Sequence, residues 1–238
     1  MIDMNSLVTL PTYTTTIPST GKQVQFRPFM VKEEKILLIA MESKDSVQIT
    51  TAIKQILENC FFNKINIEDM PYFDTEYLFV QLRMRSLGEV VEIIIKDPKT
   101  EEKFDTTMAL ENVKIINLDK EKLNFDIKIN NNFGIILKYP PISAFSGFSD
   151  EKEDPAMVFK LISKCVDKIY TKDEVLIAKE KDPIELENFI GSFTKEMFAK
   201  TLVFFNNMPK VIYEDVFVSP TTGNKLDIRV DNFRSFFR

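Results

Sequence analysis

The chain has 238 residues, 44% of them apolar, and its 31 Lys and Arg against 36 Asp and Glu give a net charge of −5. This length and apolar content allow a sizeable core without covalent cross-links, and the acidic balance disfavours a general binder of nucleic acid or anionic membranes. The sequence contains no histidine, which excludes the Ser-His, Cys-His and His-metal routes to catalysis.

The two cysteines and the N-terminus indicate the cellular compartment of the protein. Cys60 and Cys165 each lie on an apolar helical face, which favours buried thiols in a reducing cytosol over a disulfide. The first residues lack the pattern of a signal segment, and no apolar stretch approaches the roughly 20 residues of a membrane span. We therefore expect a soluble intracellular protein.

The first part of the chain predicts an arm, a strand and three helices. Residues 1–21 form a Thr/Pro-rich arm, and 22–26 alternate as a strand does. A helix begins near Lys32, and its apolar residues 36–41 fall on all sides, which predicts burial between other elements. A second helix follows Asp45 and a third covers 77–85. The second helix has a one-sided apolar stripe: Ile49, Ile53, Ile56, Leu57 and Cys60.

Two hairpins and three further helices follow in the prediction. Residues 90–95 and 104–110 flank a turn, and 211–218 and 226–230 flank another. Asp154, Asp182 and Thr194 stand at positions typical of helix N-caps. The helix after Asp154 is predicted from an apolar stripe that continues into the residues beyond Cys165: Val158, Leu161, Ile162, Cys165, Val166 and Ile169.

The two hairpin tips share a sequence pattern. The tips at 97–105 and 219–227 carry Pro, Thr, Lys and Asp at the same offsets. In zinc ribbons such a tip reads Cys-Pro-x-Cys, and two facing tips supply four ligands to the metal. Here Asp97, Thr100, Ser219 and Thr222 stand at the cysteine positions, so we expect no metal and no cofactor. The residues are compatible with a zinc ribbon that lost its metal and equally with two ordinary Pro/Gly turns.

The order of elements indicates an internal duplication. We expect an α+β fold with two pseudo-repeated units, residues 22–122 and 123–238, each built from a strand, helices and a ribbon-like hairpin without zinc ligands. The segment ending at Cys60 parallels the one ending at Cys165. The alternative is chance similarity among short amphipathic elements. Two such units packed together would bury more apolar surface than either alone.

Aromatic clusters are the candidate partner surfaces. The chain has 21 phenylalanines, and phenylalanine offers large contact area without a hydrogen-bonding requirement. The alternative for each cluster is docking on the chain's own body. The candidate partner-binding residues lie in a Phe-Arg-Pro-Phe segment, an aromatic loop and the C-terminus: Phe26, Arg27, Pro28, Phe29, Phe145, Phe148, Phe233, Phe236 and Phe237.

Several motifs are spread over nearly the whole length of the chain. They are Leu10-Pro11-Thr12-Tyr13, the run from Phe26-Arg27-Pro28-Phe29 to Lys32-Glu33-Glu34-Lys35, Arg83-Met84-Arg85-Ser86-Leu87-Gly88-Glu89, Lys138-Tyr139-Pro140 and Phe204-Phe205-Asn206-Asn207-Met208-Pro209 with the final Phe236-Phe237. With these motifs the chain resembles the T4-like bacteriophage baseplate hub assembly family, which includes a hub subunit and a hub assembly chaperone. Members often carry cysteines at the two tips, from which this chain departs.

The resemblance implies a late viral protein that builds the hub of a contractile tail without catalysis. We expect it to bind other hub or tail proteins, and to be found in the host cytoplasm during assembly or in the tail baseplate of the virion. The alternative is a degenerate zinc-ribbon-like module that binds nucleic acid, for which the test is a salt-dependent shift with DNA or RNA.

Overall fold

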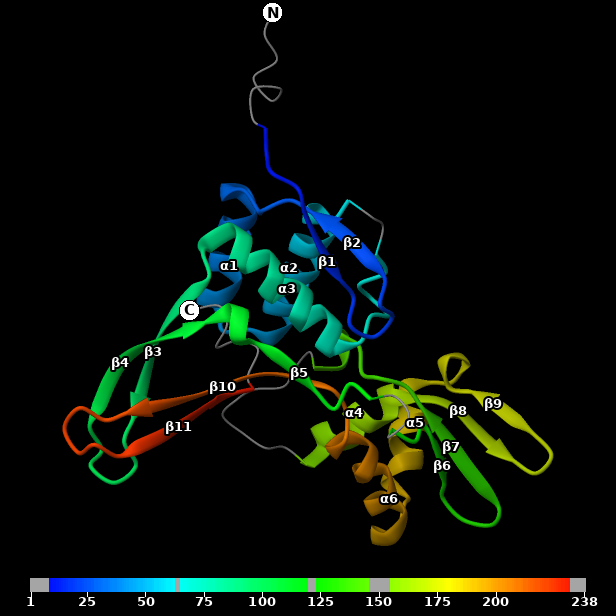
Figure 1. The fold of residues 1–238 in the computed structure, drawn as a ribbon. Helices are drawn as coiled ribbons and strands as arrows, with labels where there is room; N and C mark the ends of the chain where they lie inside the picture. The colour runs from blue at the N-terminus through cyan, green and yellow to red at the C-terminus, as the bar shows by residue number, and fades with distance from the viewer. Residues whose placement is uncertain (1–8, 63–64, 120–122, 146–154, 232–238) are drawn as a thin grey trace, which may run out of the picture.

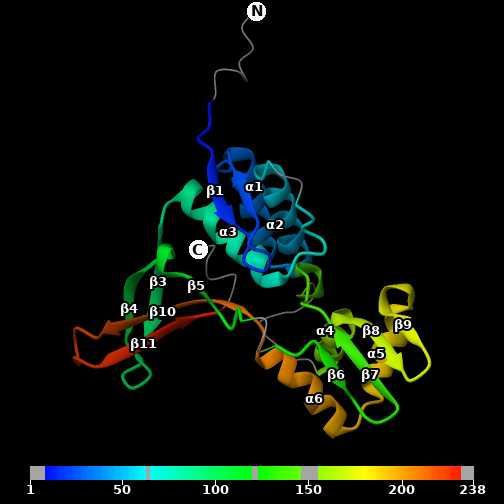
Figure 2. The same ribbon diagram turned by 45° about the vertical axis from the view of Figure 1, so that its right-hand side comes forward.

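The fold is a mixed α+β arrangement, as the sequence predicts. A computed structural model describes residues 9–62, 65–119, 123–145 and 155–231. Figures 1 and 2 show a helical body, two long hairpins that lie side by side, and a second body of helices on a small sheet. None of the described helices is long and apolar enough to cross a membrane.

The first body packs a hairpin on three helices. Strands β1 (Tyr13–Thr16) and β2 (Gln23–Phe26) are antiparallel, and α1 (Val31–Ser43), α2 (Ser46–Cys60) and α3 (Tyr72–Leu87) follow. The second helix follows Asp45, as predicted, and the carboxylate of Asp45 accepts a hydrogen bond from the Val47 N–H at 2.8 Å and caps α2. The stripe of α2 and much of α3 are buried in one apolar core with β2.

The two hairpins join segments far apart in the sequence. β3 (Val90–Lys96) pairs with β4 (Lys103–Ala109), and β10 (Lys210–Val218) pairs with β11 (Lys225–Val230). β5 (Lys114–Ile116) pairs with the start of β10, which gives a sheet in the order β11-β10-β5. The rings of Phe104 and Phe217 contact each other at 5.5 Å between centroids. The second hairpin therefore completes the core of the first body, to which Val211, Tyr213 and Ile228 belong.

The second body has its own sheet and its own core. Its antiparallel sheet has the order β6 (Asp126–Lys128), β7 (Phe133–Leu137), β8 (Val166–Thr171) and β9 (Val175–Ile177). Helices α4 (Pro155–Cys165), α5 (Pro183–Gly191) and α6 (Lys195–Asn206) accompany it. Asp182 and Thr194 cap α5 and α6 through hydrogen bonds from the N–H groups of Ile184 and Met197, as predicted. The second core runs from Leu123 to Phe204 in sequence.

Three short 3-10 turns connect these elements. They are η2 (Leu110–Asn112), η4 (Ile142–Phe145) and η5 (Ala178–Glu180). Gly134 on β7 leaves room for a neighbouring side chain, because a Cβ built there would collide with the Tyr170 hydroxyl. That hydroxyl donates a hydrogen bond to Asp126 Oδ1 at 2.6 Å. The glycine therefore allows Tyr170 to cross β7 and tie β8 to β6.

Two predictions about helices are wrong. The apolar stripe after Cys165 is not helical, because α4 ends there and Val166 begins β8. Residues 36–41 are not buried on all sides, because Leu38 and Ile39 on α1 are 56% and 55% exposed. The third helix also begins at Tyr72, five residues before the predicted start.

The two cores do not divide the chain at residue 122. The first core takes in Val211, Tyr213 and Ile228 from the end of the chain, and the second core lies between them and β5 in sequence. The pseudo-repeat of units 22–122 and 123–238 stays a proposal. If two units did arise by duplication, their last hairpins now share one core.

Candidate interaction site

The Phe-Arg-Pro-Phe segment faces inward. Phe26 and Phe29 are 2% and 8% exposed, and the Phe26 ring stacks on Phe61 with 5.1 Å between centroids. The Phe29 N–H donates to Ser86 Oγ on α3 at 3.0 Å. These two rings contact the chain's own core, so a partner could reach them only if this part of the chain rearranged.

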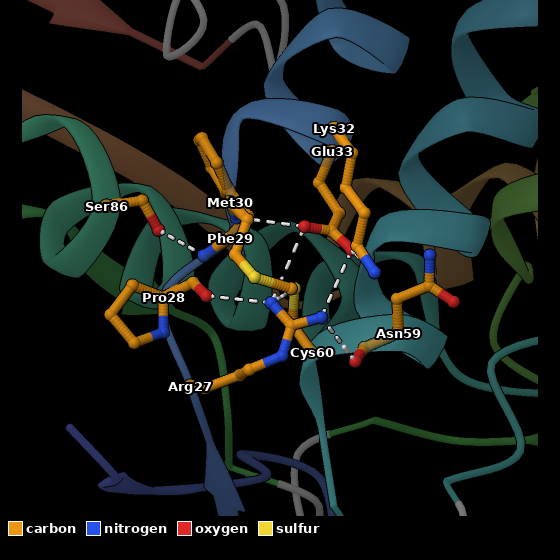
Figure 3. A network of polar contacts seen from close by, with 9 residues as sticks. All are labelled: Arg27, Pro28, Phe29, Met30, Lys32, Glu33, Asn59, Cys60 and Ser86. Carbon is orange, nitrogen blue, oxygen red and sulfur yellow. Dashed lines mark hydrogen bonds and ion pairs between the residues drawn. The ribbon is translucent and has the colours of Figure 1, made fainter. Parts of the chain in front are cut away.

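Arg27 is at the centre of a polar network (Figure 3). Its guanidinium donates to Glu33 Oε1 at 3.1 Å, to the Pro28 carbonyl at 2.9 Å and to the Asn59 carbonyl at 3.1 Å. Glu33 has no exposed area, and its second oxygen accepts the Met30 N–H at 2.8 Å. Because a buried ion pair is stable only when its remaining hydrogen bonds are satisfied, this network fixes the start of α1 against the end of α2.

The pKa values of Glu33 and Cys60 reflect this environment. Burial by itself would raise the pKa of Glu33, but the hydrogen bonds from Arg27 and from the Met30 N–H outweigh it and hold the pKa below its ordinary value. Burial raises the pKa of the Cys60 thiol to about 12, although the Arg27 charge acts in the opposite direction. Cys60 is therefore a neutral, unreactive thiol.

The second body has a matching junction at Cys165. The Arg27 N–H donates to the Cys60 carbonyl at 3.0 Å, and the Lys138 N–H donates to the Cys165 carbonyl at 2.7 Å. Burial raises the pKa of Cys165 to about 12 as well. Both cysteines are buried and free, which confirms the prediction of thiols over a disulfide.

Four large apolar side chains on α1 and in the first turn of α2 are exposed: Val31 at 80%, Leu38 at 56%, Ile39 at 55% and Val47 at 50%. We call these four residues the α1 face. Lys35 and Glu42 on α1 are exposed as well, so these aliphatic side chains stand among charged ones. Exposed aliphatic side chains of this size are candidate contacts for a partner protein. Sequence reasoning missed the α1 face, because the even distribution of apolar residues around 36–41 predicted burial.

Phe145 lines a groove between the two bodies. Its ring packs on Tyr72 with 4.1 Å between centroids. The groove has a volume of about 420 Å³, and its other apolar lining includes Phe73, Leu161, Phe205 and Met208. Of the nine candidate partner-binding residues, Phe145 is thus the phenylalanine that the structure places at a groove. Phe148, Phe233, Phe236 and Phe237 lie outside the described residues.

Glu76 is an unusual carboxylate in this groove. Its side chain is 5% exposed. Burial raises the pKa of Glu76 to about 8, with a smaller opposing effect of the hydrogen bond to Tyr72 and a further rise from the charge of Asp231. The groove is therefore lined by a carboxyl group that changes its charge near neutral pH.

The two hairpin tips have the same backbone geometry. The Asp97 N–H donates to the Glu102 carbonyl, and the Asp97 carbonyl accepts the Glu101 N–H, both at 2.9 Å. Ser219 makes the corresponding bonds with Asn224 at 2.9 Å and Gly223 at 2.8 Å. Glu101 and Gly223, at equivalent positions, have φ of 63° and 68°. The predicted equivalence of the tips is thus visible in their hydrogen bonds.

The side chains at the tips also match in burial. Asp97 and Ser219 have at most 1% exposure, whereas Thr100 and Thr222 are exposed. The hydroxyl of Thr221 donates to Glu102 Oε1 at 3.2 Å and joins the two tips. Within the described ranges, no three His, Cys, Asp or Glu side chains form a group that could hold a metal ion.

Comparisons with known proteins identify the family. Neither the curated proteins nor the solved structures gave a match. The family described as T4 bacteriophage base plate protein matches over residues 10–238, which include both bodies, both hairpins and the α1 face. The chain therefore belongs to the T4 bacteriophage base plate protein family.

Proposed function

We propose that this protein acts in assembly of the baseplate hub of a contractile-tailed phage, as a hub subunit or as a hub chaperone, by binding other hub or tail proteins. Membership of the base plate family supports a structural role in the phage tail baseplate. The finer assignment to the hub rests on the motifs in the sequence. The proposed action is structural and non-enzymatic, which agrees with the base plate family and with a sequence that contains no histidine.

The observation that carries the proposal is the exposed α1 face. Val31, Leu38 and Ile39 are more than half exposed, and each is large enough to anchor a contact if a partner covers it. The Arg27–Glu33 pair holds the start of this helix in place. The Phe-Arg-Pro-Phe segment thus serves binding indirectly, since it supports the helix that presents the face.

The proposal predicts a stoichiometric complex with a hub protein. The chain should be co-expressed with each hub and tail protein of the same phage and the mixtures separated by size-exclusion chromatography. A complex with at least one of them is expected. Elution of the chain alone from every mixture would refute the proposal.

Substitutions on the α1 face locate the contact. Leu38→Lys together with Ile39→Lys should weaken that complex by at least about tenfold, because charged groups would be buried against the partner. The matched control is Ile184→Lys on α5, where a single isoleucine is 67% exposed on the other body. If the control weakens the complex as much as the α1 variant does, the α1 face is not the contact site.

A further inference from the structure

Among the described strands, β11 has no neighbour on its outer edge, and this edge borders a groove. β11 is the edge strand of the sheet β11-β10-β5. A groove of about 580 Å³ separates it from β3, and six consecutive residues of β11, from Lys225 to Val230, line that groove. Because successive side chains of a strand point to opposite faces, lining by consecutive residues means that the backbone itself borders the groove.

The register shows which backbone groups face outward. The Ser219 N–H donates to the Asn224 carbonyl, so this pair is hydrogen-bonded. Hydrogen-bonded and non-hydrogen-bonded pairs alternate along an antiparallel ladder. The pairs Phe217–Leu226 and Asp215–Ile228 are therefore bonded across the hairpin. The N–H and C=O groups of Lys225, Asp227 and Arg229 consequently point away from β10 to the free edge.

Side chains at this edge alternate in charge. Lys225, Asp227, Arg229 and Asp231 occupy every second position. Arg229 stands opposite Glu214 and pairs with it at 2.9 Å, and it also pairs with Asp231 of its own chain at 3.6 Å. Lys225 and Asp227 stand opposite Val218 and Val216 instead. Within the described part of the chain, no ion pair is found for either of them. The β10–β11 hairpin thus offers no opposite charge to Lys225 or to Asp227.

We propose that β11 pairs antiparallel with β11 of a second copy of this chain across a two-fold axis at Ile228. In this register Asp227 faces Arg229 of the second copy, and Lys225 faces Asp231 of the second copy. Each contact occurs twice, so every charge of the row meets an opposite charge. The outward-facing N–H and C=O groups pair with one another, which satisfies the free edge. Two three-stranded sheets thus become one.

The groove runs along the edge at which the second copy would pair. Its opposite wall is formed by β3, with Ile93, Ile94 and Ile95. The apolar side chains of the incoming strand, such as Leu226 of the second copy, would meet this wall. Pairing through β11 uses none of the residues of the α1 face. The dimer proposal can therefore hold or fail whether or not the protein acts in the hub.

The test is the oligomeric state of the full-length protein, measured by sedimentation equilibrium from low to high micromolar concentration. A reversible dimer is expected. Asp227→Arg places two arginines opposite each other at both ends of the axis and should raise the dimer dissociation constant by at least about tenfold. A chain that stays monomeric throughout this range would overturn the proposal.

Charge complementation gives a stricter test. Arg229→Asp should weaken the dimer as Asp227→Arg does. An equimolar mixture of the two variants should restore a dimer, because the arginine introduced in one copy then faces the aspartate introduced in the other. Dimerisation of each variant alone at the original strength would place the contact elsewhere and refute the proposal.

A proline variant tests the backbone hydrogen bonds between the two β11 strands and leaves the pairing of Lys225 with Asp231 unchanged. Asp227→Pro removes one outward N–H group, leaves the bonds to β10 intact and should abolish the dimer. The matched control is Asp105→Pro on β4, which is the equivalent position of the first hairpin and by its register also faces away from the partner strand. Far-ultraviolet circular dichroism verifies folding of both. A dimer that survives Asp227→Pro, or one that Asp105→Pro also abolishes, contradicts pairing through β11.

Discussion

The two halves of the chain share backbone junctions but differ in the polar groups that they bury. The buried charged side chains of the described residues all precede residue 122: Glu33, Asp74, Glu76, Arg83 and Asp97. The buried polar side chains that follow are the hydroxyls of Ser163, Thr201 and Ser219. The same local geometry therefore tolerates either a charged or an uncharged buried group. The buried charges of the first half differ in their effect on stability, because some are paired and others are not.

The junction at Arg27 gives the largest expected contrast. Arg27→Ala removes the hydrogen-bonded cation of the buried Glu33 and leaves only the more distant ammonium of Lys32, at 3.6 Å, and should lower the free energy of unfolding by about 3–5 kcal/mol. The matched substitution Lys138→Ala removes an exposed side chain and should cost less than about 1 kcal/mol. Urea unfolding at pH 7 measures both values.

A double variant isolates the pair itself. Arg27→Ala combined with Glu33→Gln should recover part of the loss, because the unpaired charge is gone. Equal costs for Arg27→Ala and Lys138→Ala would show that the buried network does not stabilise the first half.

Because of Glu76, the stability of the first half should fall as the pH rises. Its pKa in the folded state, about 8, is above the ordinary value of 4.5, so the folded state holds this proton more tightly than the unfolded state. Its contribution is complete below pH 4.5 and is lost as the pH rises through 8. Glu76→Gln should flatten this decline and raise the melting temperature at about pH 9 by several degrees.

Glu33 supplies the opposite control for this experiment. Its lowered pKa means that its contribution is present above the ordinary pKa and is lost as the pH falls through the folded value. Melting curves of wild type, Glu76→Gln and Glu33→Gln from about pH 3 to 9 separate the loss of stability in acid, due to Glu33, from the loss in alkali, due to Glu76. A wild-type curve that is flat between about pH 5 and 9 would contradict the role of Glu76.

The two tips offer the smallest and most closely matched comparison. Asp97 Oδ1 accepts the Lys99 N–H at 2.8 Å, but within the described residues its buried Oδ2 has no hydrogen-bond partner. Ser219 has a single oxygen, which accepts the Thr222 N–H at 3.2 Å. Asp97→Ser should therefore raise the free energy of unfolding by about 1 kcal/mol, and Ser219→Asp should lower it by about 1–3 kcal/mol.

Thermal or urea unfolding of the two tip variants decides this point, with Thr100→Ser as the control for a small change at an exposed tip position. If Asp97→Ser destabilises the protein, the second carboxylate oxygen has a stabilising partner and the tips are not energetically equivalent.

Sequence reasoning succeeded where a local rule decides the structure. The caps at Asp182 and Thr194 and the two tips depend on residues within a few positions of each other. It failed at Val166 to Ile169, where the spacing of apolar residues fits both a helix and a strand and no Gly or Pro marks the change. The pairing of β5 with β10 joins residues 114–116 to 210–212, which no local pattern encodes.

The interaction site was harder to predict than the fold. An aromatic segment such as Phe26 to Phe29 suits a core and a partner surface equally, and the choice depends on contacts with α2 and α3 that are distant in sequence. The α1 face was missed for the same reason, because burial of one side of a helix is decided by what packs on it. Partner binding by Arg27, Pro28 and the aromatic residues remains a prediction.

The pairing of β5 with β10 has a consequence for synthesis. The hydrophobic interior around α2 and α3 lacks Val211, Tyr213 and Ile228 until the ribosome has translated the chain as far as residue 228. The amino-terminal body thus cannot mature domain by domain ahead of the rest. A product terminated before residue 210 would leave that interior open to proteolysis, so folding of the first body is conditional on translation through β10 and β11.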